Sequence, residues 1–101
     1  MFSVIYSFQV KPEHTQSFLE AWREMTLLIR DHEGGWGSRL HRQSDTLYIA
    51  YAQWPDKVTW SQSGHQLPPQ AQQIRQKMRA SCDKVETLFE LDVVDDLLLE
   101  K

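Results

Sequence analysis

The sequence predicts an α+β domain of the ferredoxin-like type, with the order β-α-β-β-α-β and an antiparallel sheet. Apolar and polar residues alternate from Phe2 to Val10, which is typical of a strand with one apolar face. A long apolar stripe at helical spacing follows and ends at Gly34-Gly35. Two extended runs joined by a short polar connection come next and indicate a hairpin.

Clear boundary residues delimit the first strand and the first helix. Pro12 ends the strand, because proline has no N–H to donate to a ladder. Glu13 at the start of the helix and Arg30 near its end suit the helix dipole. Gly34 and Gly35 end the helix, because glycine readily adopts the left-handed conformation of a helix cap. The apolar stripe of this helix consists of Phe18, Trp22, Met25 and Ile29.

The second half of the chain carries weaker signals. Arg75, Lys77 and Arg79 lie among glutamines on its helix and are interpreted as a solvated face. The apolar C-terminal leucines would suit a partner contact, and the alternative is a frayed tail. In order, we expect extended runs over residues 38–42 and 46–54, a short helix after Pro55, an irregular loop over residues 63–69, a helix over residues 70–82, a strand over residues 85–94, and a Leu97–Leu99 tail.

Composition narrows the class of protein. A chain of 101 residues forms one domain, residues 1–101. A net charge of -3 gives no electrostatic reason to expect nucleic acid as a partner. No apolar run approaches the roughly 20 residues of a membrane helix, so no membrane association is expected. A single cysteine, Cys82, cannot form an internal disulfide, and with no secretory leader in the sequence a cytoplasmic location is expected.

The predicted topology leaves one face of the sheet bare. Two crossovers of helical length place both helices on the same side of an antiparallel sheet. Packing of the other face against a second copy would cover it most simply, so we expect a homodimer.

Five short segments carry a resemblance to a known family. They are Phe8–Pro12 (FQVKP), Phe18–Trp22 (FLEAW), Glu33–Gly35 (EGG), Ala52–Pro55 (AQWP), and Trp60. Together they resemble the antibiotic-biosynthesis-monooxygenase superfamily, whose ferredoxin-like subunits pair as dimeric α/β barrels. The resemblance is best over residues 1 to about 65. Since these segments are packing and turn residues, they specify the fold more than a reaction.

The chain departs from this family at two positions. Members commonly carry a glutamate two residues before the tryptophan matched by Trp54, and this chain has Ala52 there. Many carry a histidine nine residues after that tryptophan, where this chain has Ser63. His65 follows two residues later, so a shifted helix could still present an imidazole.

The haem-degrading branch of the superfamily uses an asparagine, a tryptophan and a histidine. The matching positions here hold Tyr6, Ser63 and, near the last, Gln73. The resemblance therefore implies that this chain does not degrade haem.

Oxygenases of this superfamily typically use no metal and no flavin, so no cofactor is expected. A deprotonated phenol or quinol can itself reduce dioxygen, and the protein then supplies an apolar pocket, a base and a hydrogen-bond donor. The resemblance implies a pocket between sheet and helices, with Tyr6 as a catalytic candidate. The alternative is that these side chains are ordinary core. The candidate lining for a small aromatic ligand is Phe8, Trp22, Met25 and Trp60.

Polar candidates lie outside that stripe. His65, in an irregular loop, is the second catalytic candidate, as a base; the alternative is a solvated loop histidine. Arg39 and His41 share a strand face and could bind a carboxylate or phenolate of the substrate; the alternative is a wet edge or an interface.

Other chemistries lack their sequence signals. No C-x-x-C, H-x-H or H-E-x-x-H spacing appears, so no metal site is expected. The glycines at 34–37 lack the lysine and the following helix of a phosphate-binding loop. Cys82 is expected late in a polar helix, as a packed thiol more than as a nucleophile.

The leading functional interpretation is a cofactor-independent monooxygenase of a small aromatic, quinol or polyketide-like compound. One alternative is a non-oxidative protein of the same architecture that binds a small ligand or serves in stress response. Another is an interaction scaffold with no ligand. The fold does not decide among them, because one fold hosts many activities.

The histidine hypothesis makes a direct prediction. If His65 is the base, activity rises with pH as the imidazole loses its proton. His65→Ala then lowers turnover by about 10²-fold. The same variant changes the free energy of unfolding by less than about 0.5 kcal/mol, because a loop side chain packs little. Full activity in steady-state assays of this variant would exclude the role and make His41, beside Arg39, the next candidate.

Overall fold

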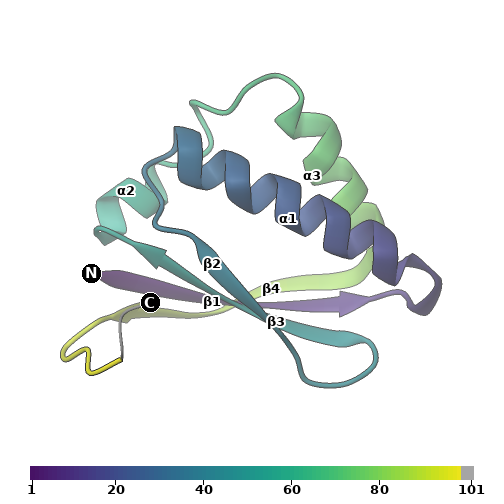
Figure 1. Ribbon diagram of the computed structural model, residues 1–101, viewed down its shortest axis with the longest axis horizontal. Helices are drawn as coiled ribbons and strands as arrows, with labels where there is room; N and C mark the ends of the chain where they lie inside the picture. The colour runs from purple at the N-terminus through teal and green to yellow at the C-terminus, as the bar shows by residue number, and fades with distance from the viewer. Residues whose placement is uncertain (99–101) are drawn as a thin grey trace.

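The computed structural model describes residues 1–98 as a four-stranded antiparallel sheet with helices on one face (Figure 1). The strand order β2-β3-β1-β4 is the ferredoxin-like α+β arrangement that the sequence predicts. The elements are β1 (Phe2–Val10), a 3-10 turn η1 (Pro12–His14), α1 (Thr15–His32), β2 (Ser38–Arg42), β3 (Leu47–Trp54), α2 (Lys57–Ser61), α3 (Ala71–Ala80) and β4 (Cys82–Asp92).

The register of the central strand β1 decides which side chains face the helices. Tyr6 lies opposite Ala50 of β3 and Thr87 of β4. Since residues directly opposite each other in an antiparallel pair share a face, the helix-facing rows of β1 and β3 are set by this pairing. Those rows contain most of the buried core: Phe2, Val4, Phe8, Val10, Tyr48, Ala50, Ala52 and Trp54.

Helix α1 packs across this core through the apolar stripe predicted for it. Phe18, Ala21 and Met25 are its buried residues. The Phe18 ring lies 5.1 Å from the ring of Phe8 and 5.4 Å from that of Tyr48, centroid to centroid. Complete burial of a side chain of this size stabilises the fold by roughly 1.5–3 kcal/mol. This aromatic cluster fixes the first half of α1 on the sheet.

Two glycines bring the chain from α1 into the sheet. Gly34 has a φ of +78°, a conformation that side chains with a Cβ rarely adopt. Gly35 passes so close to Trp54 that a Cβ there would lie 3.3 Å from the indole. The second half of α1 is therefore packed tightly against the end of β3.

The sequence prediction was wrong about where α3 ends and β4 begins. The helix ends at Ala80, and Cys82 is the first residue of β4, which runs to Asp92. The Ser81 hydroxyl donates to the carbonyl of Lys77 (2.9 Å), and the Ser81 carbonyl accepts from the amide of Lys11 (2.9 Å). Cys82 then pairs with Val10, so pairing along the whole of β1 overrides the helical pattern.

In the part of the chain that the structure describes, no helix covers the opposite face of the sheet (Figure 1). Ile5 lies opposite Tyr51 and Phe89 on this face, and Phe89 is 57% exposed. Leu97 and Leu98 of the predicted tail are exposed, and Leu99 falls outside the described residues. No helix within residues 1–98 combines the length and apolar character needed to cross a membrane.

Candidate functional site

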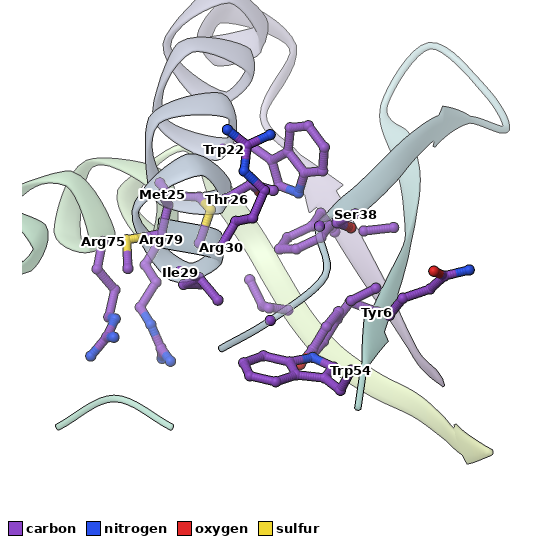
Figure 2. A pocket seen from close by; sticks show the side chains of 18 residues that line it. Tyr6, Trp22, Met25, Thr26, Ile29, Arg30, Ser38, Trp54, Arg75 and Arg79 are labelled. Carbon is purple, nitrogen blue, oxygen red and sulfur yellow. The ribbon is translucent and has the colours of Figure 1, made fainter. Parts of the chain in front are cut away.

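A mostly apolar cavity of about 290 Å³ lies between the sheet, α1 and α3 (Figure 2). Its volume is near the lower end of the range of small-molecule sites, roughly 300–1,000 Å³. Four of the sequence-predicted residues line it together: Tyr6, Phe8, Trp22 and Met25. Other apolar side chains complete the walls: Ile29, Trp54, Met78 and Val85.

The cavity exists because the middle of β3 is small. Ala50 and Ala52 form its floor, and the next helix-facing residues on either side are Tyr48 and Trp54. Bulky residues at both ends support α1, whereas two methyl groups leave the space between unfilled. The indole N–H of Trp54 is the one fully buried side-chain polar atom among the described residues that has no hydrogen-bond partner.

Tyr6 lines the cavity, but Trp60, which was also expected in the lining, does not; the two side chains meet at the Tyr6 hydroxyl. This hydroxyl accepts a hydrogen bond of 2.8 Å from the indole N–H of Trp60 in α2. Burial raises the pKa of Tyr6; the bond from Trp60 partly offsets this, and the charge of Glu90 raises the pKa slightly further. The phenol therefore stays protonated at neutral pH, and its own proton remains free to be donated to a ligand.

Cationic side chains that the sequence interpretation had assigned to a solvated face stand at this cavity. Arg75 is half-buried and Arg79 is exposed, and both contribute to the lining from α3. Lys77 points elsewhere and forms an ion pair with Glu20 of α1 (3.7 Å). The four-residue spacing of the arginines, with Met78 between them, was the sequence signal that could have revealed this.

None of the described residues that line the cavity carries a carboxylate or an imidazole. Ala52, where the resemblance leads one to expect a glutamate, contributes only a methyl group. The charged groups of the cavity are thus all cationic, namely the guanidinium groups of Arg30, Arg75 and Arg79.

The structure does not place His65 among the lining residues. Its side chain is exposed, in a loop fixed from the end of α1. The carboxylate of Glu33 accepts hydrogen bonds from the amides of Gly64 (2.8 Å) and Gln66 (2.7 Å). Glu33 itself is only 8% exposed. Sequence reasoning gave Glu33 no such role, because no local pattern links it to a loop about 30 residues later.

Arg39 and His41 lie on the uncovered face of the sheet, away from the cavity. The imidazole Nδ1 of His41 is within 3.1 Å of the carbonyl of Ile49, and both side chains are exposed. Arg39 borders a second hollow of about 190 Å³ together with Trp36 and Tyr51. The pair therefore shares a face, as expected, but does not meet Tyr6.

Cys82 is a buried thiol. Burial raises its pKa to about 11; the neighbouring charge of Asp83 adds to this, and Lys11 opposes it. The reactive thiolate is therefore scarce at neutral pH. Within residues 1–98, no three His, Cys, Asp or Glu side chains gather closely enough to hold a metal ion.

Comparison with known proteins agrees with this architecture. The sequence profile of the family described as antibiotic biosynthesis monooxygenase matches residues 1–77. No curated protein matches the chain in sequence.

Solved structures share the fold at low sequence identity. SnoaB from Streptomyces nogalater, described as a cofactor-independent oxygenase, is 18% identical with a TM-score of 0.74, and the match covers 95% of each chain. Rv0793 from Mycobacterium tuberculosis is 15% identical with a TM-score of 0.72, covering 96% of this chain and 98% of that one. A conserved protein from Methanosarcina mazei Go1 is 17% identical with a TM-score of 0.69, covering 86% and 89%.

The contact between Glu33 and the loop leads to a prediction. Glu33→Ala leaves the amides of Gly64 and Gln66 without their acceptor, so we expect faster hydrogen exchange at both amides. The free energy of unfolding should fall by about 1–3 kcal/mol. Glu24→Ala, an exposed change within α1, is the control and should stay within about 0.5 kcal/mol of the unmodified protein. Unaltered exchange at Gly64 and Gln66 in the Glu33 variant would contradict the assignment.

Proposed function

Since the chain belongs to the antibiotic biosynthesis monooxygenase family, we propose that it is a monooxygenase that acts on a small aromatic phenol or quinol without a metal, flavin or haem. The observation that carries this proposal is the apolar cavity lined by Tyr6, whose hydroxyl is kept protonated and is held by a hydrogen bond from Trp60. The description of SnoaB, which shares the fold, as a cofactor-independent oxygenase supports it.

The proposed reaction converts a phenol and dioxygen into a quinone and water. The deprotonated phenol transfers electrons from its ring to dioxygen, and a carbon–oxygen bond forms at the para carbon. Cleavage of the resulting O–O bond, with loss of the hydrogen on that carbon, leaves one oxygen atom in the quinone and releases the other as water. The substrate itself supplies the electrons, so no external reductant is needed.

The side chains of the cavity suit the charges that develop in this reaction. The cationic guanidinium groups at its border favour the phenolate over the phenol. The Tyr6 hydroxyl can donate a hydrogen bond to an oxygen atom that gains negative charge. The apolar walls keep water away from the reactive intermediate.

In this reaction a base must accept the proton of the phenol. His65 stays the proposed base, and its exposed loop would have to bring the imidazole to the cavity for it to act. Arg39 and His41 stay proposed substrate contacts, for a ligand at the second hollow, which Arg39 borders on the uncovered face of the sheet.

A second candidate function is binding of the same class of ligand without any reaction. The absence of a carboxylate or an imidazole among the described lining residues favours it. Consumption of dioxygen separates the two candidates.

We expect a phenol or quinol found by thermal-shift screening to be oxidised by the metal-free protein. Under ¹⁸O₂, the quinone product should carry one labelled oxygen atom, measured by mass spectrometry. Tyr6→Phe should lower turnover by about 10²-fold, because it removes a donor to the developing charge. Tyr48→Phe is the matched control outside the cavity lining. A ligand that stabilises the protein without oxygen uptake would favour the binding protein instead.

We also propose that the uncovered sheet face joins two copies as a homodimer, as in a dimeric α/β barrel. The exposed apolar side chains Phe89 and Leu91 lie on this face and support the proposal. A single copy leaves them in contact with water, and an isologous interface would bury them twice.

Sedimentation equilibrium tests the dimer. The mass should be about twice 11.9 kDa at micromolar concentration. Phe89→Glu should shift the equilibrium toward the monomer, because it places a charge in the interface. Leu27→Glu, on the exposed side of α1, should leave the dimer intact. A folded monomer for the unmodified protein would refute the proposed assembly.

A further inference from the structure

We propose that the cavity selects aromatic ligands that carry a carboxylate, and that Arg75 and Arg79 of α3 bind that group. This inference deepens the proposed function, on which it rests for the identity of the ligand as a substrate. It concerns binding, however, and is testable without turnover.

The two arginines are placed together by the geometry of α3. Residues four apart on a helix lie on the same face, with their Cβ atoms roughly 6 Å apart. Figure 2 shows both side chains extending from α3 in the same direction beside the cavity. Met78, between them in sequence, lines the same cavity with its thioether. The cavity therefore combines an apolar wall with two adjacent guanidinium groups on the side formed by α3.

Within residues 1–98, neither the Arg75 nor the Arg79 guanidinium lies within ion-pair distance of a carboxylate. Lys77 of the same helix, by contrast, is paired with Glu20. Arg30, on the α1 side of the cavity, already contacts Asp31 through its Nε (3.4 Å). The free positive charge at the cavity therefore comes mainly from α3.

A carboxylate fits these charges better than a neutral group does. A guanidinium offers two parallel N–H donors that match the two oxygen atoms of a carboxylate. Arg75 is half-buried beside apolar side chains, where charges interact more strongly than in water. The aromatic body of the ligand would pack against Trp22 and Met25, inside a volume that admits one or two fused rings more readily than a nucleotide.

Calorimetric titration with two non-reacting probes of the same shape tests the inference. The probes are 2-naphthoate and its neutral isostere 2-naphthamide. The unmodified protein should bind the naphthoate about tenfold or more tightly than the amide, since a hydrogen bond to a charged group contributes on this order. In the double variant Arg75→Gln/Arg79→Gln, the two affinities should become equal through loss of naphthoate binding. Lys77→Gln, on the same helix, is the matched control and should keep the preference.

Three results of this titration would contradict the proposed role of the arginine pair. Equal affinities in the unmodified protein, no binding of either probe, or an unchanged preference in the double variant would overturn the inference. Circular dichroism and the melting temperature of the double variant verify that it is folded; if it is not, the single variants Arg75→Gln and Arg79→Gln are titrated instead, and each should reduce the preference. The oxygen-uptake experiment is independent of this titration. A carboxylate preference without oxygen uptake would support this inference and contradict the proposed function. Oxygen uptake without a carboxylate preference would support the proposed function and contradict this inference.

Discussion

The way α1 is supported above the sheet is the constraint on which the rest of this structure depends. At its start, Phe18 packs between the rings of Phe8 and Tyr48. At its end, the chain passes Trp54 so closely that a Cβ at position 35 would lie 3.3 Å from the indole. Between these two contacts, the floor consists of alanine methyl groups. Because an α-helix is stiff, it does not bend toward these small side chains, and the space between remains as a cavity.

The chemistry that suits this cavity follows from what borders it. Its walls are apolar, its hydroxyl is kept protonated by burial, and its charged groups are cationic. Such a site favours a planar apolar ligand that carries or develops negative charge. It offers little to a reaction that needs a carboxylate nucleophile or a bound metal. The proposed reaction, in which the substrate supplies its own electrons to dioxygen, is compatible with these groups.

The departures from the family pattern have structural consequences. Ala52 leaves space where a glutamate side chain would project, so the floor of the cavity is neutral. The buried carboxylate of Glu33 holds the loop that follows α2, because it accepts hydrogen bonds from the amides of Gly64 and Gln66. This contact joins the end of α1 to the loop that carries His65. The position of that loop is therefore coupled to the position of α1, which covers the cavity.

The sequence by itself determined the fold, the strand and helix order, and the buried faces of β1 and α1. It did so because period-two alternation in β1, the helical stripe of α1 and the glycines after it are local signals that agree with one another. The family resemblance implied a pocket lined by Tyr6, Phe8, Trp22, Met25 and Trp60; the first four border the cavity and Trp60 does not, and their role as substrate contacts stays a prediction. The tertiary structure alone decided the end of α3, where pairing with Val10 draws Cys82 into a strand. It alone joined Tyr6 to Trp60, Glu33 to its loop, and the arginines of α3 to the cavity, because these contacts link residues far apart in the chain and depend on how the helices pack.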